Sequence, residues 1–372
     1  MELYMKGMKV EMEEKKSGCG IFLGFIALVF LAIIIVITVL YSMNPIKFEQ
    51  QLADVQVKIE DYLNQRYNFK PVYEENLIMP EVEGLAEAQR YYYFQQLSEP
   101  AKKIYVTIEE SIEKLKNGEE NIPLPASLNE VAISEGKEKV AEEFQNAWDA
   151  FITDKSEYYF IDSSKVCLVT KSITRGNDVK YEFYIGKGEN KNYFIDGYTS
   201  KEQVEKALSE IELAKKEIVE KATGNNLDKI LYVHDWMLEN ISYDSTENSK
   251  KTNIYTALIE KNTICEGYAR LFKYMMDEFE IPCVIVSGTA TDTNGKTERH
   301  AWNYVYINNN WYAVDVTWDD PIIIGTGKVT SDIKYKYFLK GDTTISKDHK
   351  ISGQITKNGK KFIVPELSLL DF

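Results

Sequence analysis

The sequence predicts an α+β protein in which a helix that carries a cysteine packs on an antiparallel sheet. A further α+β region and an N-terminal transmembrane helix precede this core. Three observations predict the fold: residues 21–40 contain no charged side chain, apolar side chains recur at helical spacing directly after Cys265, and residues 283–317 contain three strand-like runs. We expect four segments in all: a cytoplasmic tail (1–20), a transmembrane helix (21–41), a helical stalk with an α+β extracellular region (42–225) and a final domain (226–372).

The composition of the chain excludes several classes of function. The chain has 372 residues with 44 basic and 58 acidic side chains, and its net charge is −14. Such a chain offers no basic face to neutralise phosphates, so we expect no nucleic-acid partner. Four cysteines are too few for a disulfide framework, and three histidines far apart in the sequence argue against a multi-histidine metal site, so we predict no metal and no cofactor. Residues 324–330 lack the spacing of a phosphate-binding loop, so we also predict no nucleotide.

The uncharged segment is typical of a membrane anchor. A helix of twenty residues spans about 30 Å, the thickness of the hydrocarbon core of a bilayer. Residues 41–45 form a poor cleavage site, so an uncleaved anchor is favoured over a cleaved secretory signal. Four lysines precede the span, and only two follow it within residues 42–60. Because positive charge is retained on the cytoplasmic side, we predict a single-pass protein of the cell membrane whose C-terminal part is extracellular.

The region before the final domain is predicted to contain both helices and strands. Helical spacing predicts a stalk helix and two further helices, over residues 46–66, 99–116 and 137–152. β-Branched and aromatic runs then predict a meander of four strands, over residues 157–162, 165–173, 178–185 and 192–196. Ser200 and Gln203 form a capping box that starts another helix. The region also holds several tyrosines that we interpret as core and rim packing in preference to a binding groove, namely Tyr91, Tyr92, Tyr93, Tyr158 and Tyr159.

The candidate nucleophile is Cys265. Apolar side chains at positions 268, 271, 272, 275 and 279 mark a buried helix, so Cys265 lies at or just before the N-terminus of that helix. The unpaired N–H groups and the positive end of the helix dipole favour a thiolate at this position. An earlier helix carries His234 on its apolar stripe, and we interpret that residue as a core histidine.

His300 and Asp315 are the candidate partners of the cysteine. They lie on two predicted strands, 299–307 and 311–317, which three consecutive asparagines separate. Because asparagine tolerates positive φ angles, we predict a two-residue turn, at positions 308 and 309 or at positions 309 and 310. With the turn at 308 and 309, Asp315 lies diagonal to His300 on the same face of the sheet, with about 7–8 Å between the positions, which is within side-chain reach. A turn at 309 and 310 keeps Asp315 on that face. A three-residue turn would place Asp315 on the other face.

These three residue types suit nucleophilic catalysis. His300 would form an ion pair with Cys265 and then donate its proton to a leaving amine, while Asp315 would orient the imidazole. Backbone N–H groups at the helix start, including that of Cys265, are candidates for stabilising an oxyanion. Each residue also has a structural explanation, as a buried cysteine, a packed histidine and a turn-capping aspartate. The combination of a cysteine that opens a helix with a histidine and an aspartate on one hairpin favours catalysis.

Three segments of the sequence resemble one known family. The segments ICEGYAR, RHAWNYV and WYAVDVTWDDP, in this order, are similar to motifs of the transglutaminase-like superfamily of papain-type cysteine enzymes, and the resemblance covers residues 227 to about 321. It implies a papain-like core in which Cys265 matches the nucleophile, His300 the base and Asp315 the orienting acid. The arrangement also resembles surface-anchored bacterial members of the family, so we expect residues 226–372 to be a transglutaminase-like domain. No calcium dependence is expected, because the flanking domains of animal transglutaminases have no counterpart in the sequence.

The function predicted on this basis is that of a cell-surface cysteine peptidase or acyltransferase. It would act on amide bonds of a protein or peptide substrate through a thioester, with hydrolysis favoured over cross-linking because water is always present. The alternative is a non-catalytic surface module that binds peptide or wall polymer through the same groove. A third interpretation places target recognition in the region before the enzyme domain. Among the other reactive side chains, His349 is interpreted as a loop residue, and Cys167 and Cys283 as buried strand residues.

Overall fold

The computed structural model describes residues 77–80, 82, 84, 90–175, 178–246, 249–320, 331–355 and 359–372. The predicted tail, transmembrane helix and stalk helix lie outside the described residues, as does the segment 324–330. Within the ranges that are described, no helix is both long enough and apolar enough to span a membrane. The described residues belong to one unit, residues 72–372.

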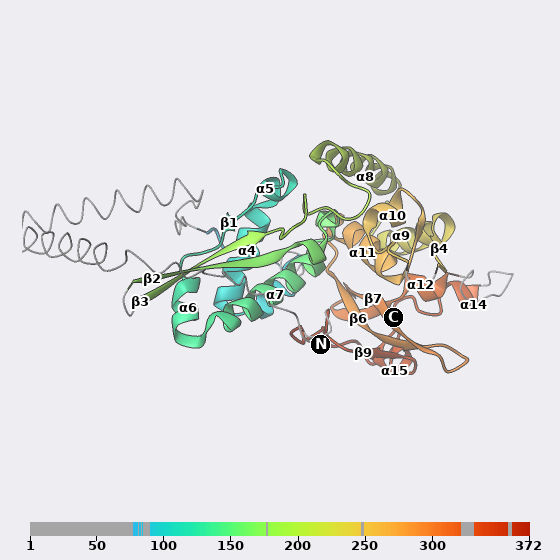
Figure 1. The fold of residues 1–372 in the computed structure, drawn as a ribbon. Coiled ribbons are helices and arrows are strands. Elements are labelled where there is room, and N and C mark those ends of the chain that lie inside the picture. Colours follow the sequence, from blue (N-terminus) through green and yellow to red (C-terminus); the bar gives the residue numbers. More distant parts are fainter. Residues whose placement is uncertain are drawn as a thin grey trace, which may run out of the picture. The chain divides into compact units, whose positions relative to one another are not determined.

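Helices and strands are mixed along this unit (Figure 1). The α-helices are α4 (Glu99–Glu110), α5 (Ile112–Lys116), α6 (Leu128–Glu135), α7 (Lys137–Asp154), α8 (Lys201–Lys221), α9 (Asn226–Asn240), α10 (Ile254–Leu258), α11 (Cys265–Glu278), α12 (Val316–Asp319), α14 (Ser331–Lys334) and α15 (Asp342–Ile345). The strands are β1 (Ile122–Pro123), β2 (Cys167–Arg175), β3 (Asp178–Gly186), β4 (Ser242–Tyr243), β5 (Asn262–Thr263), β6 (Cys283–Thr291), β7 (Thr297–Ile307), β8 (Asn310–Val314) and β9 (His349–Ile351). Short 3-10 helices are η1 (Phe94–Gln96), η2 (Ser156–Tyr158) and η3 (Ser163–Lys165).

Two predicted helices of the first half are present, and a third helix there, α6, was not predicted. The predicted helix 137–152 corresponds to α7, and the predicted helix 99–116 divides at Ser111 into α4 and α5. α4 packs against α7, and α6 packs against α7 and against β3 of the three-stranded sheet β1-β3-β2. The apolar face of α7 is buried, with Trp148 at 3% exposure and Phe151 fully enclosed. This packing forms the core on which the rest of the region is built.

The sheet of the first half is smaller than the predicted meander. β2 and β3 pair in antiparallel register along their whole length, as their alternating pattern predicts. The predicted strands 157–162 and 192–196 are wrong, because the backbone there forms a 3-10 helix and turns, joined by an isolated bridge between Ile161 and Phe194. Aromatic residues favour strands partly because strands bury them, and here Phe160 and Phe194 are buried from irregular backbone instead.

Two caps mark the passage to the second half. Ser200 caps α8 as predicted, but the Gln203 carboxamide accepts from the backbone N–H of Thr199, so the reciprocal bond of the capping box is displaced by one residue. α9 begins with a complete capping box between Asn225 and Asp228. The predicted domain boundary coincides with this helix start. It stays a prediction, because residues on both sides of it contribute to one hydrophobic core.

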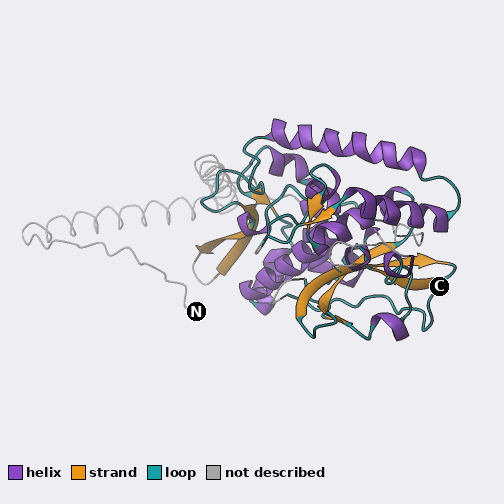
Figure 2. Ribbon diagram, turned by 90° about the vertical axis from the view of Figure 1, so that its right-hand side faces the viewer, coloured by secondary structure: helices purple, strands orange, loops and turns teal. Residues whose placement is uncertain are grey.

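The second half is built on a four-stranded antiparallel sheet with the order β8-β7-β6-β9 (Figure 2). α11 packs against β6 and β7, and α9 and α10 pack against α11 (Figure 1). The apolar stripe predicted for α11 is buried, since Tyr268, Leu271 and Phe272 are at most 1% exposed. The predicted arrangement of a cysteine-bearing helix on an antiparallel sheet is therefore present. The sequence did not predict β9, which adds to the edge of the sheet beside β6.

Tyrosines pack between the two halves. Tyr93 is buried, and its hydroxyl donates a hydrogen bond to the carbonyl oxygen of Ile285 in β6. Tyr159 is also buried, and its ring stacks on that of Tyr255 with 6.2 Å between the ring centroids. Both residues therefore act as packing residues, as the sequence analysis proposed.

Candidate active site

Cys265 is the first residue of α11, as the sequence predicts. The N-cap residue, Ile264, has an extended backbone and makes no side-chain hydrogen bond to the helix, so the first amides of α11 have no side-chain cap. Gly267 in the first turn is required by packing, because a Cβ atom there would lie 1.9 Å from the hydroxyl oxygen of Thr263. The local sequence therefore holds the helix start close to β5, with uncapped amides next to the half-buried thiol.

The β7–β8 hairpin has the predicted two-residue turn. Asn308 and Asn309 adopt positive φ angles of 49° and 63°, and Ile307 faces Asn310, so the turn lies at the first of the two predicted placements. The second strand ends at Val314, earlier than predicted, because Asp315 is the N-cap of α12. Its Oδ1 atom accepts hydrogen bonds from the backbone N–H groups of residues 317 and 318, at 3.1 and 3.2 Å. The turn-capping interpretation of Asp315 is thus correct for one of its two oxygens.

The other carboxylate oxygen of Asp315 binds His300. The Nε2 atom of His300 lies 2.7 Å from Asp315 Oδ2, and both side chains are buried. Burial alone would lower the pKa of His300, but the charge and hydrogen bond of Asp315, with smaller contributions from a hydrogen bond and the charge of Cys265, raise it to about 10. Burial would likewise raise the pKa of Asp315, but the two histidines beside it hold that pKa well below its usual range. The fold therefore brings the three predicted site residues together, and their catalytic role stays a prediction.

A second histidine binds the same carboxylate oxygen. His349 Nε2 lies 3.0 Å from Asp315 Oδ2, and His349 Nδ1 lies 2.7 Å from Asp348 Oδ1. The prediction of a loop residue was wrong, because His349 begins β9 and its side chain is 2% exposed. Gly288 in β6 permits this approach, since a Cβ atom there would lie 2.1 Å from the carbonyl oxygen of Lys350. A strand this short gives no periodic signal in the sequence, and its partner strand lies far away along the chain.

Two of the three histidines lie close together in the fold although they are far apart in the sequence, and the prediction of no multi-histidine metal site stays a prediction. His300, Asp315 and His349 each offer one atom that could bind a metal, and these atoms lie within 4.8 Å of one another. Asp315 Oδ2 is, however, in direct contact with both imidazole nitrogens at 2.7 and 3.0 Å. These are the lengths of hydrogen bonds with a proton between the two atoms. We therefore assign the cluster to hydrogen bonding and name no metal ligand.

Two tryptophans enclose the two histidines. The ring centroid of Trp302 lies 5.9 Å from that of His300 and 4.9 Å from that of His349. The corresponding distances for Trp318 are 5.5 and 4.8 Å. Large apolar rings on several sides keep water away from the hydrogen bonds to Asp315, and in such surroundings those bonds are stronger than in water.

The other reactive side chains that the sequence analysis singled out are His234, Cys283 and Cys167. His234 is fully buried and lies between two carboxylates, 3.0 Å from Asp235 Oδ1 and 3.1 Å from Asp319 Oδ2, which confirms its interpretation as a core histidine. Cys283 is fully buried in β6, and burial raises the pKa of its thiol well above the usual range. Cys167 is only half-buried at the start of β2, so the prediction of a buried strand residue holds for Cys283 and in part for Cys167.

The sequence analysis missed one residue near the thiol, Tyr243. It lies in β4, which pairs in parallel with β5, directly before the helix of Cys265. Burial and the nearby Cys265 raise the pKa of Tyr243 to about 12, so the phenol is protonated at neutral pH and can donate a hydrogen bond. A tyrosine that precedes an aspartate in a polar stretch is a common pattern, and nothing in the sequence separates this one from the other tyrosines.

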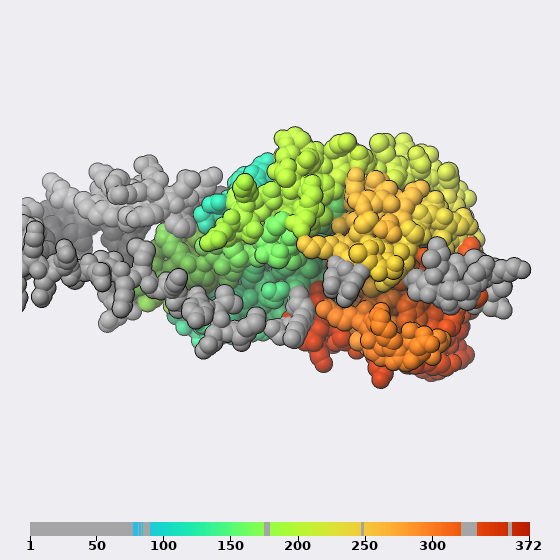
Figure 3. Space-filling view, turned by 45° about the vertical axis from the view of Figure 1, so that its right-hand side comes forward, coloured from blue at the N-terminus to red at the C-terminus, as the bar shows by residue number. Residues whose placement is uncertain are grey.

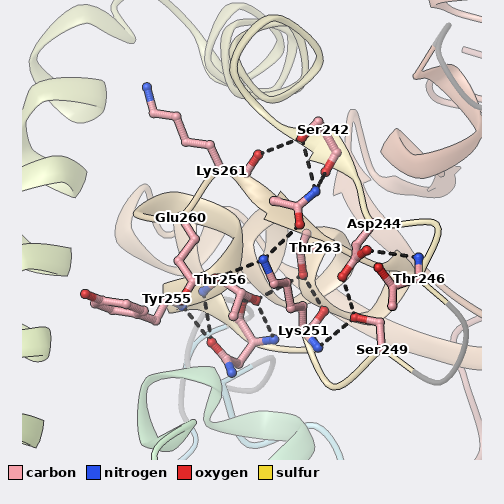
Figure 4. Close-up of polar contacts among 12 residues, drawn as sticks. Ser242, Asp244, Thr246, Ser249, Lys251, Tyr255, Thr256, Glu260, Lys261 and Thr263 are labelled. Carbon is pink, nitrogen blue, oxygen red and sulfur yellow. Dashed lines mark hydrogen bonds and ion pairs between the residues drawn. The ribbon is translucent and has the colours of Figure 1, made fainter. Parts of the chain in front are cut away.

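Hydrogen bonds fix the chain between β4 and α11 (Figure 4). Asp244 accepts from the backbone N–H of Thr246 at 3.0 Å and from the Ser249 hydroxyl at 2.7 Å. The Thr263 hydroxyl donates to the carbonyl oxygen of Lys251 at 2.6 Å. The Asp244 bonds fix the described residues after β4, and the Thr263 bond ties the connecting chain to the residues that immediately precede Cys265.

A groove of about 880 Å³ lies beside the first turns of α11. Its walls come from the first half of the unit and from the chain before α11, which lie side by side in the space-filling view (Figure 3). Glu266 and Arg270 of α11 line one wall, and Tyr159, Tyr198 and Tyr255 line another part. Some tyrosines, such as Tyr159, therefore both pack in the core and line a groove. The sequence analysis had preferred packing to a binding groove for these residues.

Comparison with known proteins identifies one family in this part of the chain. Residues 213–316 match the Transglutaminase-like superfamily. The kyphoscoliosis peptidase of Mus musculus is 28% identical over 137 residues, which are 34% of this chain and 21% of the relative. The kyphoscoliosis peptidase of Homo sapiens is 28% identical over 136 residues, which are 33% of this chain and 21% of the relative. The match thus spans about a fifth of the length of these two curated relatives.

Solved structures of similar proteins include a crystal structure of a TGase, with 14% sequence identity and a TM-score of 0.30, covering 53% of this chain and 55% of the other. They also include the periplasmic domain of TgpA from Pseudomonas aeruginosa bound to ethylmercury, with 12% identity and a TM-score of 0.23. That comparison covers 42% of this chain and 69% of the other.

Proposed function

Because the chain carries a transglutaminase-like domain, we propose that it is a cysteine enzyme that acts on amide bonds of peptides or proteins through a thioester at Cys265. The observation that carries the proposal is the 2.7 Å contact between His300 and Asp315, on the hairpin beside the helix that Cys265 opens. The raised pKa of His300, to which Cys265 contributes, supports an interaction between the thiol and the imidazole. Similarity to kyphoscoliosis peptidase supports hydrolysis as the type of reaction.

The first half of the proposed reaction forms the thioester. With a pKa of about 10, His300 carries a proton at neutral pH and stabilises a thiolate on Cys265. The thiolate attacks the carbonyl carbon of the amide, and a tetrahedral oxyanion results. When this intermediate collapses, the C–N bond breaks and His300 gives its proton to the nitrogen, so that an amine leaves and a thioester remains. Asp315 keeps the imidazole in the required orientation throughout.

Two kinds of donor can stabilise the oxyanion. The uncapped backbone N–H groups at the start of α11, including that of Cys265, lie at the positive end of the helix dipole. The protonated phenol of Tyr243 adds a side-chain donor near the thiol. Replacing Tyr243 by Phe should therefore lower kcat about 10-fold or more and leave KM nearly unchanged, since one donor that acts mainly in the transition state is lost.

The second half of the proposed reaction releases the product. A water molecule attacks the thioester, neutral His300 accepts its proton, and the C–S bond breaks to give a carboxylic acid and the free cysteine. An amine in place of water would give a new amide and hence a cross-link. We favour hydrolysis, because water is always present.

We also propose that the enzyme acts at the cell surface. The support is the uncharged segment 21–40 and the excess of lysine before it, which predict an anchor with an extracellular C-terminal part. A protease added to intact cells should then digest residues 90–372, and digestion only after the membrane is permeabilised would contradict the proposed location.

The chemical state of Cys265 provides the test of the proposed function. The full-length protein in mild detergent is alkylated with iodoacetamide between pH 4 and 9, and the modified cysteines are located by mass spectrometry. We expect Cys265 to react well below pH 8.5, where an ordinary thiol is protonated, and to lose this reactivity in His300→Ala. Cys167 serves as an internal control for a half-buried thiol.

If Cys265 reacts no faster than Cys167 at neutral pH, the thiol is not activated. The non-catalytic peptide-binding module then becomes the better description. The tyrosine-lined groove beside α11 would be its binding surface.

A further inference from the structure

We propose that His349 is a positioning residue of this site: it holds the Asp315 carboxylate against His300 and is itself kept in the doubly protonated form by Asp348. The inference rests on the proposed function, because the site that His349 supports is the one formed by Cys265, His300 and Asp315. His349 does not touch the thiol through any contact described for it, so it acts through Asp315, to which it is hydrogen-bonded, and through His300, whose ring lies beside its own.

The first step of the argument is the way in which Asp315 is held. Its Oδ1 atom accepts from the backbone N–H groups of residues 317 and 318, and its Oδ2 atom accepts from His300 and His349. Four donors thus fix a carboxylate that is 1% exposed. The backbone donors position one oxygen only. Without His349, the oxygen that orients His300 would be held by His300 alone, and the pair could turn together.

The second step concerns the protons on His349. Its two ring nitrogens lie 3.0 Å from Asp315 Oδ2 and 2.7 Å from Asp348 Oδ1. An ionised carboxylate only accepts hydrogen bonds, so both nitrogens of His349 must donate, and the ring is an imidazolium. The Tyr337 hydroxyl donates to Asp348 Oδ2 at 2.8 Å and keeps Asp348 in place. The charged and titratable groups that face His349 among the described residues are Asp315, Asp348, His300 and Tyr337, whose ring centroid lies 5.4 Å from that of His349.

The third step is the effect of this positive charge on His300. The ring centroids of His300 and His349 are 5.4 Å apart. At an effective dielectric constant of about 20, a unit charge at that separation shifts a titration by about two pH units. His349 therefore offsets part of the attraction of Asp315 for the proton on His300. Without His349, Asp315 would hold the proton on His300 more tightly. With His349 present, that proton is easier to transfer to a leaving amine.

The test uses full-length protein in detergent with ¹⁵N-labelled histidine. The chain has only three histidines, so each ring can be followed separately by NMR. In the wild type we expect both nitrogens of His349 to be protonated at neutral pH. We expect His300 to be protonated as well, with its Nε2 proton hydrogen-bonded. This measurement needs no substrate and no turnover.

Three variants separate the roles of His349. His349→Gln keeps a donor toward Asp315 and removes the charge, so the titration of His300 should move up by about one to two pH units, while the rate of Cys265 alkylation at pH 7 changes by less than about threefold. His349→Phe replaces the imidazole by an aromatic ring without a hydrogen-bond donor, so the rate of Cys265 alkylation should fall about tenfold or more. Asp348→Asn leaves Asp315 untouched, and His349 should then carry a single ring proton. The Asp348 side chain is 26% exposed, so Asp348→Asn tests the proposal even if the His349 variants do not fold.

His234→Gln is the matched control. His234 is also buried between two carboxylates but does not contact Asp315, so this variant should leave the titration of His300 and the alkylation of Cys265 unchanged. A singly protonated His349 in the wild type would overturn the proposal. So would equal alkylation rates in the wild type and His349→Phe. If His349 is doubly protonated but wild-type Cys265 is as inert as Cys167, the proposed function fails, and the hydrogen-bonded chain around Asp315 still stands.

Discussion

Replacing Asp315 by Asn should remove the charge that keeps His300 protonated. In the wild type the pKa of His300 is raised from 6.5 to about 10, a difference of about 3.5 units, or about 5 kcal/mol. In Asp315→Asn the attraction is lost and burial, which lowers the pKa, remains. The pKa should then lie at or below 6.5, so at pH 7.5 at most about one tenth of the protein would carry an imidazolium.

Alkylation of Cys265 by iodoacetamide measures the consequence. At pH 7.5 the rate in Asp315→Asn should fall about tenfold or more, and it should recover only above pH 8.5, where an ordinary thiol ionises. Asp319→Asn is the matched control, since Asp319 is also a buried aspartate that binds a histidine but does not touch His300. The reasoning is refuted if Asp315→Asn reacts as the wild type does at pH 7.5 while His300 remains protonated.

The same pair should affect stability with a defined dependence on pH. The pKa of His300 is higher in the folded than in the unfolded protein, so its stabilising contribution is complete below pH 6.5 and is lost as the pH rises through about 10. In urea unfolding, the difference in stability between the wild type and Asp315→Asn should therefore shrink between pH 7 and pH 10. A difference that grows over this range would contradict the proposed ion pair.

Three further predictions each concern the effect of replacing one residue on the stability of the fold. Gly267→Ala places a Cβ atom 1.9 Å from the Thr263 hydroxyl, so it should destabilise the protein by about 1–3 kcal/mol in urea unfolding and reduce Cys265 alkylation, and an unchanged protein would contradict the packing argument. Asn309→Ala should cost about 1 kcal/mol because Asn309 has a φ of 63°, whereas Asn309→Gly should cost little; equal costs would argue against the turn. Burial raises the pKa of Asp154 to about 7, so its contribution to stability is complete below pH 3.8 and is lost as the pH rises through 7. The stability advantage of the wild type over Asp154→Asn should decrease from pH 4 to pH 7, and a constant difference would show that Asp154 is ionised throughout.

The sequence predicts those parts of the site that depend on local patterns. Cys265 can be placed at a helix start because the apolar positions after it repeat with helical spacing. The relation between His300 and Asp315 can be derived because they lie on adjacent strands joined by a turn whose length the asparagines determine. Where neighbours in space are also neighbours in sequence, the length of the turn decides which face of the sheet each side chain takes, and the predicted two-residue turn is present.

The sequence does not predict contacts between distant segments. His349 reaches Asp315 only because β9 joins the edge of β6, and a strand of three residues leaves no period to recognise. Tyr243 comes near Cys265 through a two-residue parallel pairing that has no pattern of its own. The two wrong strands fail for a related reason. Their aromatic residues are buried as expected, but the backbone that carries them is irregular and does not form a strand ladder.

The measurement that tests the central claim most directly is detection of the acyl intermediate on Cys265. Full-length protein is mixed with a synthetic peptide library in H₂¹⁸O, quenched in acid within seconds, and digested for mass spectrometry. We predict an acyl adduct on Cys265 that accumulates and decays, with ¹⁸O in the new carboxyl groups of cleaved peptides, and neither signal in Cys265→Ala. Cleavage that persists in Cys265→Ala, or a Cys265 that never carries an acyl group in the wild type, would contradict the account.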